Sequence, residues 1–356
     1  MNVLITGGSG YLGQFLVHGL AGQGYTVHYA YGSRQLASAP PGVVAHKVDL
    51  ATGEGLQEAF DQAPFHAVIN CAAISQPAVC ENSPDTARAV NVPSHLVDCL
   101  LRQEQVRAGL RAVLVHISTD QVYDGSRAHW KEDEAGGQVN VYGRTKYEAE
   151  THILSRLPEP YPVAILRSSI IYGPPAPDPV PRPLFLQFVA SAVSNPDKPT
   201  SFFQDEYRSP VHVRDLQRIT ELLIAAHGQQ LASEAAAAAA AARGGGQAAE
   251  AAAVPARALE ALAPEALAAV AARRHRVFNA GGPERLSRVD MARQVADCLG
   301  CGYDSIESVP SASVARGVVS PPDISMDVSR LQSDLGYSPA AFRDAIKDIL
   351  QPPATK

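Results

Sequence analysis

A glycine-rich turn between an apolar run and a helical pattern limits most strongly the folds open to this chain. Residues 2–6 are a short apolar run of the kind found in buried parallel strands. Gly7, Gly10 and Gly13 follow at a GxxGxxG spacing, and residues 14–20 have helical periodicity. In this order the absent side chains let the backbone approach a pyrophosphate, which the helix N-terminus faces. The sequence therefore predicts a dinucleotide site rather than a plain glycine turn.

The end of the next strand bears on which dinucleotide binds. Residues 25–31 predict a second strand, and an acidic residue at its end would bind the ribose 2′-hydroxyl of NAD. Gly32, Ser33 and Arg34 stand there instead. A hydroxyl and a guanidinium suit a 2′-phosphate, so we expect NADP(H) rather than NAD(H). Arg34 is equally consistent with a solvated loop charge.

Further apolar runs continue the alternation of strand and helix. The runs that predict strands cover residues 43–48, 67–70, 112–118 and 163–166. Helices are expected over residues 84–102, 142–157, 184–194, 213–226, 287–299 and 340–350. Alternating β and α elements without an internal repeat predict an α/β fold, a doubly wound parallel sheet of Rossmann type with a smaller C-terminal substrate-binding lobe.

The length of 356 residues favours about two domains. We assign residues 1–172 to a dinucleotide-binding domain and residues 173–356 mainly to a substrate-binding lobe, some of whose elements return to the first domain. Residues 231–272 hold 23 alanines among 42 positions. This segment is interpreted as a low-complexity insertion, partly helical or disordered, that docks weakly for want of bulky apolar residues and has no catalytic role.

A phenol and an amine stand at a spacing that suits acid catalysis. Tyr142 and Lys146 are four residues apart in an expected helix, which puts both side chains on one face. The ammonium is expected to lower the phenol pKa from about 10, so that Tyr142 can give a proton to a developing alkoxide. Thr119 follows the strand over residues 112–118, and ligands gather at the carboxyl ends of such strands. Its hydroxyl is therefore expected beside the phenol.

Two polar residues near the expected site keep two interpretations each. Asp49 follows the third apolar run, where an acid can take the adenine amino group or cap the next helix. Asn91 lies inside the expected helix over residues 84–102. Because a buried amide needs partners, it is a structural bridge or an organiser of the site.

Charge, hydropathy and cysteine usage exclude several classes of function. The net charge of −6 gives no sign of binding to nucleic acid or an anionic membrane, and no apolar run approaches the roughly 20 residues of a membrane helix. With the first strand starting at Asn2, no signal peptide is expected, and the odd count of five cysteines predicts reduced thiols in the cytoplasm. Cys298 and Cys301 form a CxxC, interpreted as a helix end and turn, so no metal is expected.

Taken together, the motifs resemble those of the extended short-chain dehydrogenase/reductases. The resemblance rests on Gly7-x-x-Gly10-x-x-Gly13, Asn70-Cys71-Ala72-Ala73, Ser118-Thr119-Asp120 and Tyr142-x-x-x-Lys146. The runs over residues 117–125, 141–150, 208–215 and 278–282 are similar to the branch that holds dTDP-4-dehydrorhamnose reductase and the regulatory β subunit of methionine adenosyltransferase. The resemblance covers nearly the whole chain apart from the alanine-rich segment.

The resemblance implies a catalytic triad of Thr119, Tyr142 and Lys146. Tyr142 would donate the proton to a carbonyl oxygen that Thr119 also binds, while Lys146 holds the nicotinamide ribose and NADPH supplies the hydride. The expected cofactor-binding residues are Gly7, Gly10, Tyr11, Leu12, Gly13, Ser33, Arg34, Asp49, Leu50, Cys71, Ala72, Ala73, Asn91, Ser118, Tyr142, Lys146, Arg167 and Ser169.

Substrate contacts are expected from Asp120, Gln121, Trp130 and Arg208. The related 4,6-dehydratases have an Asp-Glu pair after the threonine, and here Gln121 replaces the acid, so dehydration is disfavoured. Reductases of the branch usually carry an aromatic residue at the Gln121 position, which leaves the substrate open. Trp130, Arg208 and His212 are each equally consistent with a core or surface role.

The leading hypothesis is an NADPH-dependent reductase of a 4-keto sugar nucleotide. The rival is a non-catalytic NADP(H)-binding subunit that regulates a partner of the methionine adenosyltransferase type. A sugar-nucleotide epimerase would need tightly held NAD and fits Ser33 and Arg34 poorly. We expect a nucleotide-sugar ligand and no nucleic acid or membrane partner; a homodimer and a regulated partner enzyme both stay open.

Overall fold

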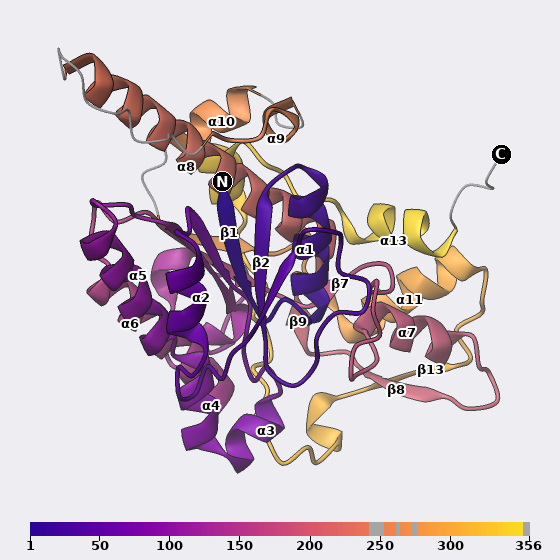
Figure 1. The fold of residues 1–356 in the computed structure, drawn as a ribbon. Helices are drawn as coiled ribbons and strands as arrows, with labels where there is room; N and C mark the ends of the chain where they lie inside the picture. Colours follow the sequence, from indigo (N-terminus) through magenta and orange to yellow (C-terminus); the bar gives the residue numbers. More distant parts are fainter. Residues whose placement is uncertain (242–252, 261–263, 272–275, 352–356) are drawn as a thin grey trace.

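A seven-stranded sheet forms the centre of the protein, seen in a computed structural model that describes residues 1–241, 253–260, 264–271 and 276–351 (Figure 1). Its strands lie in the order β11-β6-β5-β4-β1-β2-β3, and every neighbouring pair is parallel. The order runs outward from β1 in both directions, so the chain changes direction between β1 and β4. The doubly wound α/β sheet predicted from the alternating pattern is confirmed.

The strands of this sheet correspond to the apolar runs of the sequence. They are β1 (Asn2–Thr6), β2 (Thr26–Tyr31), β3 (Val44–Lys47), β4 (Ala67–Asn70), β5 (Val113–Thr119), β6 (Val163–Ser168) and β11 (Val277–Ala280). Alternate residues of β1 enter different cores, Val3 and Ile5 on one face and Leu4 on the other. Because both faces are covered, the strands read as continuous apolar runs.

Helices cover both faces of the sheet. On one side lie α2 (Leu56–Gln62), α5 (Ser94–Val106) and α6 (Val141–Arg156), which Figure 1 shows grouped together. The other core receives α1 (Tyr11–Gly22) and α8 (Val213–Ala241). In an open sheet of this kind, ligands bind at the carboxyl ends of the strands.

A smaller lobe beside the sheet has its own apolar core. Its elements are α7 (Phe185–Val193), α11 (Arg288–Leu299), α13 (Phe342–Leu350) and the parallel pair of β8 (Thr200–Phe203) with β13 (Ile306–Val309). Short pairings connect the segments that lead into it: β7 (Ile171–Tyr172) with β10 (Val211–His212), and β9 (Tyr207–Arg208) with β12 (Leu286–Ser287). The second pairing brings Arg208 next to the start of α11.

The helix expected over residues 84–102 is instead two helices, α4 (Pro84–Asn91) and α5. Pro93 stands between them, and a proline without an N–H cannot continue a helix. Two short helices, α3 (Pro77–Asn82) and α12 (Ser329–Leu335), were not predicted.

The alanine-rich segment docks better than its composition suggested. Inside it lie the end of α8 and the helices α9 (Ala256–Glu260) and α10 (Pro264–Ala271). Ala258, Leu267 and Val270 are buried in the core that α1 and α8 share. The expectation of weak docking was wrong for α9 and α10, because a few apolar residues at helical spacing suffice to seat a short helix. The parts of the segment over 242–252, 261–263 and residue 272 lie outside the described residues.

The end of α11 confirms the interpretation of the CxxC pair. Gly300 follows the helix in a left-handed conformation, with φ of +67°, which closes the helix end. Cys298 and Cys301 are both free thiols.

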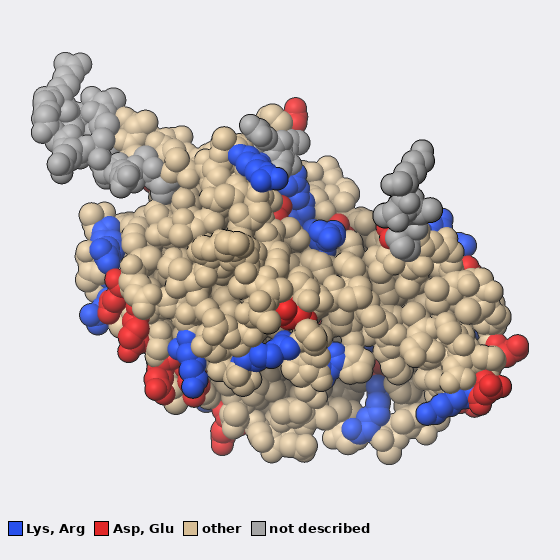
Figure 2. All heavy atoms as spheres, turned by 45° about the vertical axis from the view of Figure 1, so that its right-hand side comes forward, with Lys and Arg blue, Asp and Glu red and all other residues tan. Residues whose placement is uncertain are grey.

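Charged side chains are scattered over the surface in Figure 2, with basic and acidic groups interspersed. Within the described ranges, no helix is long and apolar enough to cross a bilayer.

A pair of buried histidines links β2 and β3. His28 Nδ1 lies 2.9 Å from His46 Nε2, and the two rings stack with centroids 5.2 Å apart. Burial, with a smaller effect of His46, lowers the pKa of His28 to about 4, and burial also lowers the pKa of His46. Both imidazoles are therefore neutral in the folded protein at neutral pH.

This pair is expected to make the fold sensitive to acid. Both folded-state pKa values are below the unfolded value of about 6.5, so the full stability is present above that pH and is lost as the pH falls toward about 4. In His46→Gln the drop in Tm between pH 7 and pH 5 should be smaller than in the wild type by several degrees. The exposed His95→Gln serves as the control, and identical drops in all three proteins would contradict the prediction.

Candidate active site

Two adjoining cavities lie along the carboxyl edge of the sheet. The first has a volume of about 780 Å³ and the second about 520 Å³. Gly7, Gly10, Cys71 and Ala73 line both cavities, so the two cavities meet at the glycine turn. This size suits a dinucleotide in one part and a second small molecule in the other.

The glycine turn leaves no room for side chains. Gly7 has a φ of +66°, and a Cβ placed on it would lie 2.8 Å from Ala72 Cα. A Cβ on Gly13 would lie 2.2 Å from Gly7 O, so α1 packs directly on the turn. The backbone at the start of α1 is thus exposed to the cavity as a cradle, and these residues fit the pyrophosphate of a nicotinamide dinucleotide.

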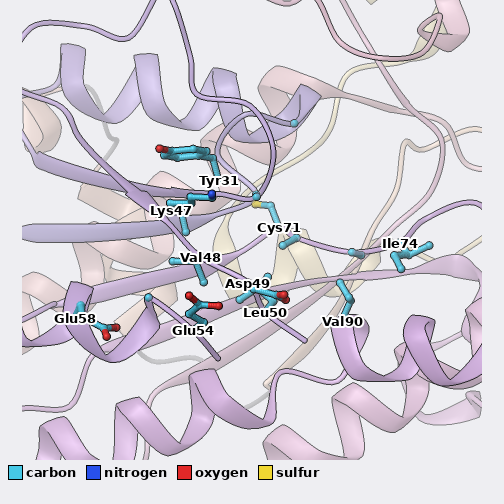
Figure 3. Close-up of a pocket in the computed structure, with 17 residues that line it drawn as sticks. Tyr31, Lys47, Val48, Asp49, Leu50, Glu54, Glu58, Cys71, Ile74 and Val90 are labelled. Atoms are coloured by element: carbon cyan, nitrogen blue, oxygen red, sulfur yellow. The ribbon is translucent and has the colours of Figure 1, made fainter. Parts of the chain in front are cut away.

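The far wall of the first cavity suits an adenosine group. Figure 3 shows Tyr31 and Lys47 on one side of it and Asp49, Leu50 and Glu54 on another. The carboxylate of Asp49 accepts a hydrogen bond of 2.8 Å from Ala51 N, which stabilises the local turn. Asp49 thus combines a turn role with a place in the cavity wall, and neither of its two interpretations is excluded.

Arg34 is not among the residues that line this cavity. Its guanidinium donates to Ser9 O at 3.3 Å and to Pro179 O, which connects the glycine turn to the segment over residues 174–183, where six of ten residues are proline. Lys47 is the basic residue that lines the first cavity near Tyr31. It pairs with Tyr31 in the sheet. Sequence reasoning missed Lys47, although a lysine two positions before Asp49 was the available signal.

The small residues after β4 occupy the positions expected of them. Cys71, Ala72 and Ala73 line the first cavity next to the glycine turn. Asn91 is buried behind them, where its amide donates to Ile74 O at 3.2 Å and to Thr145 Oγ1 at 2.9 Å. This geometry favours the structural bridge among its two interpretations.

Tyr142 and Lys146 reach the second cavity because α6 packs closely on the end of β5. Asn140 caps the helix by accepting a hydrogen bond of 2.8 Å from Gly143 N. A Cβ on Gly143 would lie 2.2 Å from Gln121 O, so only glycine allows this approach. As a result Thr119, Tyr142 and Lys146, each at least nine-tenths buried, all line the cavity.

Burial controls the charges of this group. Burial raises the pKa of the Tyr142 phenol, and hydrogen bonding to Thr119 only partly offsets that effect. The expected lowering by Lys146 is not what this structure shows, because the Lys146 ammonium makes its hydrogen bonds with β5: Nζ donates to Ile117 O at 2.7 Å and lies 3.1 Å from His116 Nε2. Burial lowers the pKa of Lys146 to about 8, although Glu150 opposes this.

Charged side chains also line the second cavity; among them Arg208 is buried, Arg288 is half-buried and Arg182 is exposed. Arg182, Arg208 and Arg288 line it together with Asp120. Burial lowers the pKa of Arg288 to about 10. Burial raises the pKa of Asp120, against the effect of Arg208, and its carboxylate accepts a hydrogen bond of 2.6 Å from Ser169 Oγ. Three guanidiniums beside a reactive phenol suit an anionic ligand.

Sequence reasoning found Arg208 but missed Arg182 and Arg288. The signal for Arg288 was its place at the start of the helix expected over residues 287–299; in the structure it is the first residue of α11, after the Ser287 cap. Gln121, proposed as a substrate contact, lines the cavity, and its Oε1 accepts a hydrogen bond of 2.8 Å from Asn140.

Trp130 and Arg167 lie away from both cavities. The Trp130 ring stacks on Tyr123, with centroids 5.2 Å apart, and its Nε1 donates to Asp323 O at 2.9 Å. Arg167 donates to Glu150 at 2.6 Å from Nη2 and to the Tyr123 hydroxyl at 3.0 Å. These contacts favour a core role for Trp130. They place the Arg167 guanidinium in a buried ion pair with Glu150 and not at a cofactor site. The direction of both side chains depends on three-dimensional packing, which their position in the chain did not reveal.

Ser118 and His212 also have structural partners. The Ser118 hydroxyl donates to Glu150, while the rest of the residue lines the second cavity. His212 packs beside Tyr172, with centroids 5.6 Å apart, and burial lowers its pKa.

This fold and this edge are those of the extended short-chain dehydrogenase/reductase type, with a glycine turn that fits a dinucleotide. The family model described as the RmlD substrate binding domain matches residues 1–242. The chain belongs to that family.

Curated relatives of the chain have different roles. It is 30% identical over 229 residues to the probable low-salt glycan biosynthesis reductase Agl14 of Haloferax volcanii, covering 64% of this chain and 71% of that protein. It is 24% identical to the methionine adenosyltransferase 2 subunit beta of Bos taurus, covering 98% and 87%. A dTDP-4-dehydrorhamnose reductase of Mycolicibacterium smegmatis is 32% identical over 174 residues, covering 48% and 46%.

Solved structures share the fold. The dTDP-4-dehydrorhamnose reductase of Bacillus anthracis, determined in complex with NADP, has a TM-score of 0.69 at 17% identity and covers 98% of both chains. The UDP-glucose 4-epimerase of Thermotoga maritima has a TM-score of 0.71 at 18% identity, covering 99% of this chain and 98% of that one.

The expected preference for NADP(H) over NAD(H) can be tested at Arg34 and Lys47. If Arg34 contacts a 2′-phosphate, Arg34→Ala should raise the Kd of NADPH by about tenfold and change that of NADH little, as expected for one charge-assisted hydrogen bond. Titration of cofactor fluorescence measures both constants. Equal losses for NADPH and NADH would contradict the contact, and a selective loss in Lys47→Ala alone would move the 2′-phosphate site to Lys47.

Proposed function

We propose that the protein is an NADPH-dependent reductase of a 4-keto sugar nucleotide. The observation that carries the proposal is the meeting of Thr119, Tyr142 and Lys146 with the glycine turn in one cavity. When bound, NADPH supplies the hydride. The protein's contribution is to bind, orient and protonate the substrate.

Tyr142 acts as the proton donor in this proposal. Its phenol is protonated at neutral pH because burial raises its pKa, so it is in the form that can donate to a developing alkoxide. The Thr119 hydroxyl, at the end of β5, holds the same carbonyl oxygen. Lys146 lies one turn along α6, lines the same cavity and would hold the ribose of the dinucleotide.

The arginines support an anionic substrate. A nucleotide sugar carries a diphosphate, and Arg182, Arg208 and Arg288 offer guanidiniums that bind phosphate oxygens in pairs. Gln121 follows Asp120 where an acid would be needed for dehydration, so reduction is favoured over loss of water.

A second candidate function is regulation of a methionine adenosyltransferase. It is supported by similarity to the bovine subunit beta over 98% of this chain. Affinity capture of purified methionine adenosyltransferase by the purified protein tests this role. Binding without any turnover of sugar nucleotides would favour it over the reductase.

Tyr142→Phe tests the proposed chemistry. With NADPH and dTDP-4-keto-6-deoxy-L-mannose, the wild type should consume the reduced cofactor, measured by its absorbance. Loss of the acid should lower kcat by a hundredfold or more, about the contribution of general acid catalysis. Tyr147→Phe, on the same helix, should retain activity. No consumption by the wild type would contradict this substrate, and full activity in Tyr142→Phe would contradict the mechanism.

Arg288→Met tests the diphosphate contact. Loss of a charge-assisted hydrogen bond should raise the KM for the nucleotide sugar by about ten- to a hundredfold, while the Kd of NADPH changes little. Arg293→Met, exposed on the same helix, is the matched control. An unchanged KM, or an equal loss of NADPH binding, would show that Arg288 does not bind the sugar nucleotide.

A further inference from the structure

The Lys146 ammonium is held by the sheet and not by a carboxylate at hydrogen-bond distance. Nζ is buried, donates to Ile117 O at 2.7 Å and lies 3.1 Å from His116 Nε2. An ammonium has three N–H groups. Ile117 O accepts one of them, His116 Nε2 lies within reach of a second, and Lys146 also lines the second cavity.

His116 is the end of a polar row that crosses three strands. Thr6 of β1 pairs with Asn70 of β4, and Asn70 pairs with His116 of β5. Their side chains follow the same order: Thr6 Oγ1 lies 2.5 Å from Asn70 Oδ1, and Asn70 Nδ2 lies 2.9 Å from His116 Nδ1. All three residues are at least nine-tenths buried. The other ring nitrogen of His116, Nε2, lies next to Lys146 Nζ.

The protons of this row depend on one another. His116 is neutral, because burial and, second, Lys146 lower its pKa well below the usual value. A neutral imidazole has one N–H and one lone pair. If Nε2 accepts from the ammonium, Nδ1 carries the hydrogen and Asn70 has to offer its oxygen. A 180° rotation of the Asn70 side-chain amide turns its oxygen toward Nδ1, and its nitrogen then donates to Thr6 Oγ1.

The opposite arrangement requires a different charge on Lys146. If the Asn70 nitrogen donates to Nδ1, Nε2 carries the hydrogen and points it at Nζ. Only a neutral amine can accept it. The tautomer of His116 and the charge of Lys146 are therefore coupled.

We propose that His116 is a positioning residue for Lys146: its neutral imidazole, held by Asn70, accepts one N–H of the ammonium through Nε2 and keeps Lys146 charged and aimed at the cofactor cavity. Only the catalytic consequence rests on the proposed reductase function. Sequence patterns had marked Lys146 but not His116, which reads as one residue of an apolar strand.

The groups around Lys146 define what His116 adds. Glu150, one turn further along α6, and Cys71, after β4, favour the ammonium, while burial opposes it and brings its pKa to about 8. Tyr142 lies on the same helix face. Since the net pKa is near physiological pH, loss of one acceptor would leave a large share of Lys146 neutral at that pH.

NMR of the lysine side chains tests the proposal without substrate. The sequence has six lysines, so a protein labelled with ¹³C at lysine Cε gives few signals, and Lys146→Arg assigns the one of interest. In the wild type Lys146 should titrate near pH 8. In His116→Phe, which removes the acceptor, the midpoint should fall by about one pH unit. In His116→Gln, whose amide oxygen can accept, it should stay close to the wild-type value.

An unchanged midpoint in His116→Phe would overturn the proposal, and so would a rise, which would mean that His116 donates to an amine. If His116→Phe does not fold, ¹⁵N NMR of the wild type decides. Of the eleven histidines, the one missing from His116→Gln should show a protonated Nδ1 and a bare Nε2 at pH 7. A protonated Nε2 would overturn the proposal.

Turnover separates this inference from the proposed function. If the protein reduces the keto sugar nucleotide, the pH profile of kcat should shift downward in His116→Phe by the same unit as the Lys146 midpoint and be restored in His116→Gln. A merely structural role would lower kcat at every pH and leave the profile in place, which counts against the proposal. Absence of turnover in the wild type would contradict the reductase function and leave the NMR results to decide on His116.

Discussion

The close contact of α6 with the end of β5 is the interaction on which the site depends. Gly143 lies against the backbone of Gln121, and any side chain there would push the helix outward. With the helix seated, Tyr142 comes beside Thr119 and Lys146 reaches the carbonyl of Ile117. The same seating buries the phenol and the amine, so geometry and electrostatics have one cause.

Burial explains why the phenol and the amine have opposite shifts of pKa. A low-dielectric site disfavours the charged form of each, which raises the pKa of Tyr142 and lowers that of Lys146. The usual account, in which the ammonium lowers the phenol pKa, needs Lys146 to direct its charge at Tyr142. Here Nζ lies against Ile117 O and His116 Nε2 of β5 instead, at the wall of the second cavity.

The elements and their order could be predicted from the sequence because a parallel strand buried on both faces is a continuous apolar run. The glycine turn could be predicted as well, since at Gly7 and Gly13 the backbone itself makes the contact. The contacts of side chains that reach across the fold could not be predicted from the sequence. Arg34 and Arg167 have the right residue type at plausible positions, yet each guanidinium is taken by partners far along the chain, Pro179 for one and Glu150 for the other.

Two residues that sequence reasoning missed, Arg288 and His116, reach the candidate site through a neighbour in another strand or lobe. Arg288 enters the cavity because β9 and β12 pair and bring the start of α11 to the sheet edge. His116 meets Lys146 because β4, β5 and α6 pack in register. Both carry polar groups into a buried space, where an unpaired group costs about 1–3 kcal/mol. A polar side chain packed next to Lys146 or Tyr142 is therefore a candidate site residue even where it belongs to no motif.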